Sequence, residues 1–591
     1  MVVKRIRPKS RREDAIFEFD GDQRSYLNSP HTLRQIVVAG PGSGKTTVAI
    51  QRVVDLDTSL SATQGIEHPS AVLFLSFSRA SIRAAAKSMS TDLASLNVEF
   101  QAQTIDSLAY EICRYDGQMS LTELDQTDFP ERLRIAGRIA NAEGENLTYD
   151  LRHIFVDEAQ DVSPDQADFL RQYLTHLPVD CGVTVFADPD QEIYRFLDSK
   201  RESTPRWDYF HQQLRKVCPW KYITFHGQYR AQSVSMRRTL DSLDKVRSEQ
   251  DRARKTAQLD RVQSRLPTIT LDRLANNTAS RATQSALLAR TNADVTACFD
   301  HLRRSGCSNL SPVFPTEWQG LYPGWIGEVA CSIRGFVFSS QELRDSFENT
   351  TRPNVDPDPT THLNLGLRRQ MTWDEVKEFY DTLGFRQKTA DPGRLIISTI
   401  HQSKGLEFDD VAILQPDKLL LRDPSELEVL FVALSRARNM TYAVAPPDDL
   451  LNFRTCGRRL MKFRYSGKRR FLTHLSIIPG DITVPASLGV ERSENPSSID
   501  QNSFISFDPI RSRSVFTYVC KVDGKVVGET TEAFGSFLQR EVGTGTPPHL
   551  GSVPIAAIET QFVPGPRGLR PILVPIPCGV SEILQSKRTF S

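Results

Sequence analysis

The sequence predicts an α/β protein with two parallel-sheet domains and a β-rich C-terminal region. Short, continuous apolar runs alternate with helical stretches, and continuous runs are typical of strands that a parallel sheet buries on both faces. The runs form two series, at 36–39, 72–76, 154–156 and 183–187 and then at 286–289, 395–399, 411–414 and 441–444. From about residue 450 the patterns alternate, as at 515–527 around Asp523-Gly524, and these predict antiparallel hairpins.

The breaks in these patterns divide the chain into five expected regions. A polar stretch reads as a helical insert, and a longer insert contains an aromatic loop at 318–325 and a Pro- and Asp-rich linker at 349–359. We expect a first α/β domain at 1–109 and 151–222 with an insert at 110–150, a second domain at 223–295 and 391–475 with an insert at 296–390, and a β-rich accessory region at 476–591.

Composition indicates an ordinary globular protein without a strong overall charge. Of the 591 residues 39% are hydrophobic, and 73 basic residues balance 72 acidic ones to leave a net charge of +1. A uniformly basic nucleic-acid binder is therefore not indicated, so any nucleic-acid groove must come from local charge. The nine scattered cysteines have no zinc-knuckle spacing and fit a reducing compartment. Because no run is long enough to span a bilayer and no signal-peptide pattern is present, we expect a cytoplasmic protein without membrane contact.

A glycine-rich segment follows the first apolar run. It comprises Ala39, Gly40, Pro41, Gly42, Ser43, Gly44, Lys45, Thr46 and Thr47, which have the spacing of a phosphate-binding loop between a strand and a helix. Glycines let backbone N–H groups approach phosphate oxygens closely. Lys45 is expected to reach the β and γ phosphates and Thr46 to bind Mg²⁺ through its hydroxyl, so the sequence predicts ATP and Mg²⁺ as cofactors.

Acidic and amide residues follow two later runs of the first series. Asp157 and Glu158 come directly after 154–156, and open α/β sheets bind ligands at this end of their strands. Asp157 is expected to hold Mg²⁺, and Glu158 to orient the attacking water or take its proton. Gln191, after the run 183–187, can touch both the γ-phosphate and that water. Taken alone, Asp157 and Glu158 would be interpreted as solvated acids at the end of a strand. Together with a phosphate-binding loop they predict hydrolysis of the nucleotide.

Two aromatic residues, Tyr194 and Phe196, follow Gln191 closely. Their flat faces are suited to stacking on nucleic-acid bases. Packing into the core is an equally good reading from sequence alone.

The order of these segments resembles that of superfamily 1 helicases of the UvrD/Rep type. Gln23 lies upstream of the loop, where this family has an adenine-reading glutamine. Residues 157–161 and 187–194 resemble motifs II and III. Further matches are 75–80 and 104–109, at the positions of two single-strand contact motifs, then 228–230 (motif IV), 399–408 (motif V) and 432–438 (motif VI). The matches run in the family's order from residue 23 to 438.

The resemblance implies roles that the patterns alone do not assign. It implies two RecA-like domains with nucleotide in the cleft between them, Tyr229 stacked on adenine and Glu407 on the ribose hydroxyl. Arg230 and Arg436 would reach the γ-phosphate as arginine fingers, because a planar guanidinium binds phosphate oxygens bidentately. An isolated arginine would more simply form a salt bridge. The residues that would face single-stranded DNA are Phe77, Thr104, Tyr194, Phe196, Thr399 and His401.

The chain also departs from the family pattern. Asp106 stands where the family usually has histidine, and an acid facing a phosphate backbone would repel it. Leu197, Asp198 and Ser199 follow Phe196 where the family has an arginine. Both inserts are shorter than in processive relatives. The ATP-hydrolysing half is thus complete and the DNA-gripping half altered, which favours a compact motor that depends on a partner.

A basic segment lies between the second domain and the C-terminal region. It contains Arg454, Arg458, Arg459, Lys462, Arg464, Lys468, Arg469 and Arg470, interleaved with Phe463, Tyr465 and Phe471 and without an acid. Such a composition is typical of a surface that tracks single-stranded nucleic acid. The alternatives are a solvated basic helix, a surface for an acidic partner, or a segment that closes the second motor domain, since residues 470–472 resemble a family segment after motif VI.

The C-terminal region resembles no family. Asp508 followed by Asp523 and Lys525 has the spacing of a metal-dependent nuclease, but a two-residue hairpin turn at Asp523-Gly524 is the simpler account. We expect a β-rich docking module there.

Two functions follow as expectations. The first is an ATP-dependent translocase and helicase on single-stranded or tailed DNA, 3′→5′ by the family trend, in repair, end-processing or antiviral defence. The second is an ATP-gated DNA-sensing subunit without strong unwinding, in a larger complex for which a nuclease is one candidate partner.

Overall fold

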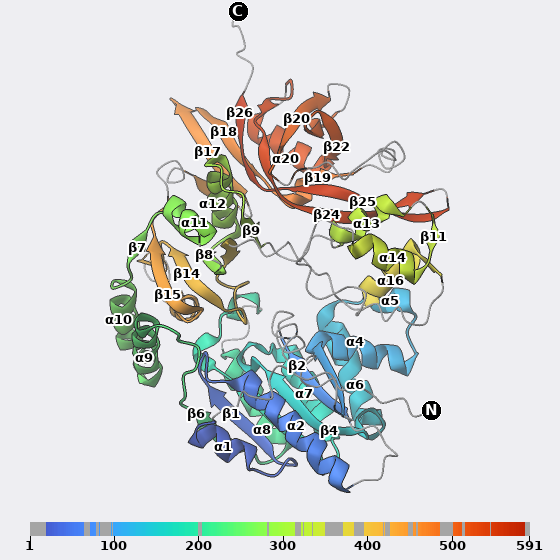
Figure 1. Ribbon diagram of the computed structural model, residues 1–591, viewed down its shortest axis with the longest axis vertical. Helices are drawn as coiled ribbons and strands as arrows, with labels where there is room; N and C mark the ends of the chain where they lie inside the picture. The colour runs from blue at the N-terminus through green and yellow to red at the C-terminus, as the bar shows by residue number, and fades with distance from the viewer. Residues whose placement is uncertain are drawn as a thin grey trace, which may run out of the picture. The chain divides into compact units, whose positions relative to one another are not determined.

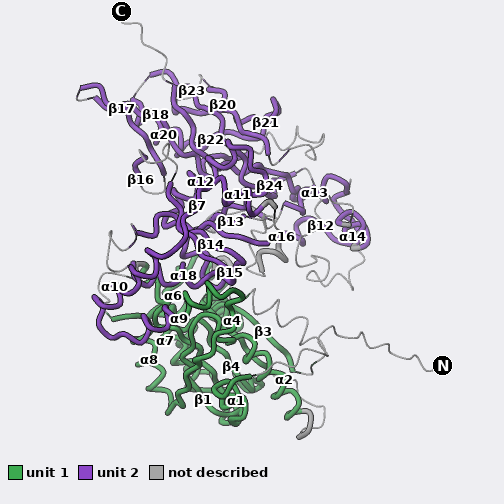
Figure 2. The backbone as a smooth tube through the Cα atoms, turned by 60° about the vertical axis from the view of Figure 1, so that its left-hand side comes forward, with its two compact units in different colours: residues 1–240 green, residues 241–591 purple. Residues whose placement is uncertain are grey.

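The protein divides into two compact units, residues 1–240 (unit 1) and 241–591 (unit 2), shown in Figure 2. This computed structural model describes residues 19–63, 71–77, 82, 96, 98–198, 204–280, 283–313, 321–322, 324–333, 335–348, 370–382, 395–417, 419, 426–446, 453–456, 459–467, 469–484, 500, 502–510, 514–543, 545–565 and 567–584. Of the predicted segments, the linker at 349–359 and half of the aromatic loop at 318–325, namely 318–320 and 323, lie outside the described residues.

Unit 1 contains a six-stranded, all-parallel sheet (Figure 1). Its spatial order is β3 (Glu99–Thr104), β2 (Ala71–Ser76), β4 (Leu151–Asp157), β5 (Gly182–Ala187), β1 (Arg34–Ala39) and β6 (Lys221–Phe225). The helices are α1 (Gly21–Leu27), α2 (Lys45–Thr63), α4 (Ile105–Asp116), α5 (Leu121–Gln126), α6 (Phe129–Thr148), α7 (Pro164–Thr175) and α8 (Arg206–Val217), with short 3₁₀ turns η1 (Ala159–Asp161), η2 (Pro189–Gln191) and η3 (Arg195–Leu197).

Helices cover both faces of this sheet. Alternate strand residues point to opposite faces, so Leu73 and Ile154 join one core with α4, α6, α7 and α8, whereas Phe74 and Phe155 join another with α1 and α2. Because both faces are covered, β2 and β5 are buried along their whole length, which explains their continuous apolar runs. The segment expected as a helical insert, 110–150, is helical, and its buried residues belong to the first of these cores.

Unit 2 contains a second six-stranded parallel sheet, which confirms the predicted pair of α/β folds. Its order is β7 (Thr268–Ile269), β15 (Ala437–Val444), β14 (Phe408–Leu414), β8 (Ser285–Ala289), β13 (Leu395–Thr399) and β9 (Leu310–Pro312). The accompanying helices are α10 (Arg252–Gln263), α11 (Leu271–Ser280), α12 (Asn292–Arg304) and α18 (Leu427–Leu434), and α9 (Val234–Ser248) spans the boundary between the units.

A small helical layer packs on the longest hairpin of unit 2. The layer consists of β10 (Leu321–Tyr322), α13 (Gly324–Ser332), β11 (Val337–Phe338), α14 (Ser340–Glu348), β12 (Met371–Thr372) and α16 (Trp373–Thr382). The hairpin is β24 (Val553–Gly565) with β25 (Gly568–Pro577). Thr560 of β24 holds α13 through its hydroxyl, which accepts a 2.8 Å hydrogen bond from the Gly327 amide.

The C-terminal region is built of antiparallel strands, as predicted. One sheet has the order β16 (Arg454–Cys456), β17 (Arg459–Ser466), β18 (Arg469–Ile477), β26 (Gly579–Leu584) and β23 (His549–Leu550). The other joins β10 and β24 to β20 (Phe504–Ile510), β21 (Thr517–Val522), β22 (Lys525–Thr530) and β19 (Ile482–Thr483), and α20 (Glu532–Val542) shares their core.

Three segments differ in the structure from what the sequence patterns indicated. Residues 223–225 were expected to open the second domain, but they lie in β6 and pair with β1 of the first sheet. Residues 310–312, expected in the second insert, form the edge strand β9 of the parallel sheet. The basic segment forms β strands rather than a helix, and β18 pairs with β26 instead of closing the parallel sheet.

The hairpin account of Asp523-Gly524 agrees with the structure. Both residues have positive φ, 49° and 79°, and they join β21 to β22 as a two-residue turn. Asp508 forms an ion pair with Lys521 at 2.6 Å, and Asp523 accepts a hydrogen bond from Ser503. Within the described ranges no helix is long and apolar enough to cross a membrane.

Candidate functional site

The phosphate loop lies at the carboxyl end of β1, which pairs with β5 and with the edge strand β6 of the first sheet. Gly42 and Gly44 have φ values of +74° and +81°, a left-handed backbone that glycine adopts without steric cost. Helix α2 begins at Lys45, so the partly buried Thr46 and Thr47 lie in its first turn. The positive end of the helix dipole therefore points to where phosphates would bind.

Side chains of the loop hold its own backbone. The Lys45 ammonium donates to the carbonyls of Ala39 and Gly40, at 3.0 and 3.1 Å. The buried Ser43 hydroxyl also donates to the Gly40 carbonyl, at 2.8 Å. The ammonium is thus already inside the concave side of the loop, and it needs only to exchange carbonyl oxygens for phosphate oxygens.

The predicted catalytic acids lie at the same edge of the sheet. In the register Asp157 pairs with Ser76, and Val38, next to the loop, pairs with Ala187. The carboxyl ends of β1, β2, β4 and β5 therefore meet at one edge. Glu158 turns the chain there with a φ of 52°, which is unusual for a residue other than glycine.

A chain of side-chain hydrogen bonds links Glu158 to Gln191. The buried Gln160 donates to the Glu158 carboxylate at 2.5 Å and accepts from the Asp188 amide at 2.9 Å. The Gln191 amide donates to the Asp188 carboxylate, also at 2.5 Å. The two residues expected to handle water are thus connected through Gln160 and Asp188, which lie in the segments resembling motifs II and III but had been assigned no role.

The segment after β6 lies directly on the phosphate loop. The Gln228 side chain donates to the Pro41 carbonyl at 2.6 Å, and the Tyr229 amide donates to the Gly42 carbonyl at 2.8 Å. A Cβ on Gly42 would collide with Gln228 and with Cβ of Arg230. Tyr229 and Arg230 were expected in the second domain, but they belong to unit 1 and contact the loop from within it.

Gln23 and Tyr229 are held by one helix cap. Asp20 caps α1 by accepting from the Gln23 amide, and it also accepts a 2.6 Å hydrogen bond from the Tyr229 hydroxyl. The Gln23 side chain donates to the Ser43 carbonyl at 3.0 Å. Removal from water, with a smaller contribution from the bond to Asp20, raises the pKa of Tyr229 to about 12. The ring of Tyr229 is 51% exposed, so a flat surface is presented beside the loop.

Two of the aromatic residues predicted to face DNA form a pair. The rings of Phe77 and Tyr194 lie 5.1 Å apart between centroids. The guanidinium of Arg206 lies 5.6 Å from the Phe77 ring centroid. It is buried, donates to the Asp161 carbonyl at 2.7 Å, and forms a bidentate ion pair with Asp198 at 2.6 and 2.8 Å.

Arg206 escaped prediction because it lies in no motif. The signal was the acid Asp198, next to Leu197 where the family has an arginine, since a buried acid requires a cationic partner. Glu192 supports the same corner by accepting from the Arg206 and Trp207 amides, and its burial raises its pKa.

The second predicted DNA motif is occupied by contacts within the protein. Thr104 caps α4 by accepting from the Ser107 amide. Both carboxylate oxygens of Asp106 accept from the Gln166 amide, at 3.1 and 3.2 Å. Asp106 therefore forms a contact between helices α4 and α7.

Phe196, also predicted to face DNA, lies in η3.

In unit 2 the predicted nucleic-acid residues lie at the end of β13. Thr399 is buried, accepts from the Gln402 amide at 3.2 Å, and donates to its side chain at 3.1 Å. His401 is partly buried in the turn that follows.

The residues of unit 2 predicted for the nucleotide are engaged locally. Glu407 forms an ion pair with Arg438 at 3.3 Å. Arg436 is 2% exposed, and its guanidinium donates to the Val432 carbonyl and to the Ser435 hydroxyl. The roles expected for Glu407 and Arg436 remain predictions.

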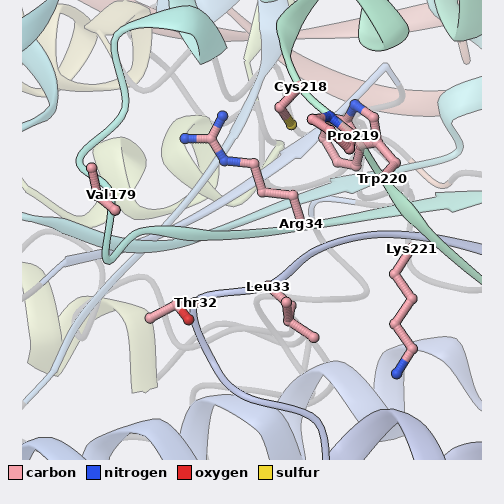
Figure 3. Close-up of a pocket in the computed structure, with 8 residues that line it drawn as sticks. All are labelled: Thr32, Leu33, Arg34, Val179, Cys218, Pro219, Trp220 and Lys221. Atoms are coloured by element: carbon pink, nitrogen blue, oxygen red, sulfur yellow. The ribbon is translucent and has the colours of Figure 1, made fainter.

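A cavity lies at the amino-terminal ends of strands in the first sheet, opposite the end that carries the phosphate loop. Its volume is about 510 Å³, and it is lined by residues before β5 and at the starts of β1 and β6, among them Arg34 and Lys221 (Figure 3). The phosphate loop and the acids lie at the carboxyl ends of the same strands. The cavity is therefore separate from the predicted site.

The comparisons with known proteins match two separate segments of the chain. Residues 25–197 match the family model of an AAA domain, and residues 395–444 match that of a UvrD-like helicase C-terminal domain. The first match covers the phosphate loop, the acids and Gln191, and the second covers Thr399, His401, Glu407 and Arg436. No curated protein matches the chain.

Solved structures of helicases give weak structural matches. The Pif1 helicase from Candida albicans has 12% identity and a TM-score of 0.36 over 72% of this chain and 95% of that one. The Bacteroides Pif1 helicase in complex with ADP-AlF3 and ssDNA has 15% identity and a TM-score of 0.35, over 73% and 93%. Such scores carry no argument, so the assignment rests on the family models and the ordered motifs. By these, the chain is similar to the ATP-hydrolysing helicases of superfamily 1 over residues 25–197 and 395–444.

Proposed function

We propose that the chain couples ATP hydrolysis to 3′→5′ movement along single-stranded DNA and thereby separates the strands of tailed duplexes. One observation carries the proposal. The carboxyl edge of the first sheet presents the loop with Lys45, the acids Asp157 and Glu158, and the Phe77–Tyr194 ring pair. ATP chemistry and a surface suited to base stacking thus share one edge of one rigid sheet.

The residues of this edge suit a triphosphate with Mg²⁺. The Thr46 hydroxyl and the Asp157 carboxylate are hard oxygen ligands, and they would hold the ion together with phosphate oxygens. Among the described residues no cluster of His, Cys, Asp and Glu could hold a metal by itself, which fits an ion shared with the substrate. When bound, Mg²⁺ neutralises charge on the phosphates.

The remaining roles are proposed from position for the residues of unit 1 and from the family resemblance for Arg436 and Glu407 of unit 2. Lys45 binds the phosphates, and Glu158 orients the water, with Gln160 fixing its carboxylate. Tyr229 stacks on adenine, and Gln23, which also lies beside Gly44 of the loop, reads it. Arg230, Arg436 and Glu407 contact the nucleotide when it binds. Toward DNA we propose Phe77, Thr104, Tyr194, Phe196, Thr399 and His401.

The test is ATP turnover with and without single-stranded DNA. We expect DNA to stimulate turnover at least tenfold, and we expect Lys45→Ala and Glu158→Gln to abolish it. Strand displacement from a duplex with a 3′ tail, compared with one with a 5′ tail, gives the polarity. Turnover that ignores DNA would contradict the motor function and leave the ATPase assignment intact.

A second function, an ATP-gated DNA sensor, is favoured by the altered DNA motifs. Asp106 is bound to Gln166, and Asp198 is bound to Arg206, so neither position offers a cation to a phosphate backbone. This function predicts DNA-stimulated turnover without strand displacement. Repair, end-processing and antiviral defence in the cytoplasm, with a nuclease as possible partner, are the proposed contexts, and co-purification from the native host tests them.

A further inference from the structure

The basic segment of the C-terminal region forms a hairpin whose outer part is solvent-exposed. Strands β17 and β18 are antiparallel, and in both views they extend away from the body of the C-terminal strands (Figures 1 and 2). Arg464, Arg469 and Arg470 are exposed, and Tyr465 is 54% exposed. A tyrosine that served only to pack the core would be buried. The exposure of Tyr465 therefore indicates that the outer hairpin has a role other than packing.

Aromatic and basic side chains alternate on this hairpin. In the register Tyr465 lies opposite Arg470, and Arg464 lies opposite Phe471. Directly opposed residues share a face, so each face carries an aromatic ring beside an arginine. The guanidinium of Arg454, from the neighbouring β16, lies 5.9 Å from the Tyr465 ring centroid.

Among the described residues, carboxylates neutralise some arginines of this hairpin and not others. Arg459, at its base, is bound to the buried Asp481, and Arg470 forms an ion pair with Glu541 of α20 at 3.1 Å. Within the described part of the chain, by contrast, no carboxylate forms an ion pair with Arg464 or Arg469. Unneutralised arginines on a projecting hairpin attract an anionic partner.

We propose that the outer β17–β18 hairpin is a second binding surface for single-stranded DNA, outside the two parallel-sheet domains. Arg464 and Arg469 share one face of the hairpin and contact phosphates there, and Tyr465, on the other face beside Arg454, stacks on a base. Clustered cations alone would equally suit an acidic protein, but the exposed ring of Tyr465 among the cations favours a single strand, whose bases stack on aromatic side chains. That the ligand is single-stranded DNA rests on the proposed function, whereas binding of DNA to the hairpin needs no ATP hydrolysis.

Binding is measured by fluorescence anisotropy of a labelled 30-nucleotide oligothymidine against the full chain, without nucleotide, over a series of salt concentrations. We expect Arg464→Ala/Arg469→Ala to weaken binding about tenfold, and to lower the slope of log affinity against log salt by about 1.4, since each lost phosphate contact on a single strand removes about 0.7. Tyr465→Ala is expected to weaken binding at least fivefold, whereas Tyr465→Phe, which keeps the ring, stays close to wild type.

The matched control is Arg254→Ala/Arg261→Ala on α10, which removes the same charge from exposed positions elsewhere in unit 2. Unchanged binding and salt slope in the hairpin variants would overturn the proposal and leave an acidic protein as the occupant, even if DNA stimulates ATP turnover. Weakened binding in these variants, with wild-type behaviour of the control, supports the hairpin even if turnover proves indifferent to DNA.

Discussion

The Tyr229 hydroxyl donates a 2.6 Å hydrogen bond to the Asp20 carboxylate, across 209 positions of sequence. Asp20 also caps α1 and fixes Gln23, whose side chain holds the Ser43 carbonyl of the phosphate loop. Asp20 therefore positions two residues proposed to recognise adenine. The backbone of Tyr229 is held independently, by the Gly42 carbonyl.

We predict that the ring of Tyr229, and not its hydroxyl, determines ATP affinity. Tyr229→Ala removes the stacking surface and is expected to raise the KM for ATP at least fivefold with little change in kcat. Tyr229→Phe loses only the half-exposed bond to Asp20, so its KM should stay within about threefold of wild type. Steady-state ATP turnover measures both, and an equal rise in the two variants would show that the bond to Asp20 is the important contact.

Gly42 should be intolerant of alanine. Its φ of +74° costs an L-residue about 1–2 kcal/mol, and a Cβ would also collide with Gln228 and Arg230. We expect Gly42→Ala to weaken ATP binding at least tenfold by calorimetry. Gly21→Ala is the control, because a Cβ on Gly21 in the first turn of α1 meets open space, and its affinity should equal that of wild type. Wild-type affinity in Gly42→Ala would show that the loop does not bind ATP in this conformation.

The sequence patterns predicted the inner strands of both parallel sheets and missed edge strands. The run at 395–399 coincides with β13, because an inner strand is buried on both faces and reads as continuously apolar. β3 and β6 each pair with a single neighbour and are partly exposed, so their sequences carry no continuous run. Inner strands are recognised by their burial, whereas edge strands are only partly buried and depend more on their local context. Continuous apolar runs detect burial alone and therefore miss the edge strands.

Local motifs identified the residues proposed to face the ligand and not the residues that hold them in place. Lys45 and Glu158 lie in contiguous segments whose spacing encodes their geometry. The pairing of Arg206 with Asp198, and of Tyr229 with Asp20, depends on how distant segments fold together, which no local spacing records. Of these four residues, only Asp20 could have been recognised from its neighbours in the sequence, because Asp20 and Gln23 have the spacing of a helix capping box.

Buried His153 should make the stability of unit 1 depend on pH. Desolvation inside the first sheet lowers the pKa of His153 to about 3, while the unfolded chain keeps a value near 6.5. Between these values only the unfolded state binds the proton, so stability is complete above about pH 6.5 and falls as pH decreases. From pH 6.5 to pH 5 we expect a loss of about 2 kcal/mol in the free energy of unfolding, measured with urea. His153→Gln should lack this contribution, and an unchanged slope in that variant would contradict the assignment.

Arg206 should couple stability to DNA response through the Phe77–Tyr194 pair. Arg206→Ala leaves Asp198 buried without its partner, and we expect a loss of about 3–5 kcal/mol in the free energy of unfolding. Arg206→Met/Asp198→Leu removes both charges and should recover most of this stability. Because the guanidinium that lies by the Phe77 ring is still missing, stimulation of ATP turnover by DNA should remain several-fold lower in the double variant, with basal turnover unchanged. Urea unfolding and turnover with and without oligothymidine separate the two effects. Full DNA stimulation in the stable double variant would show that Arg206 serves the fold alone and that the ring pair needs no cation to meet a base.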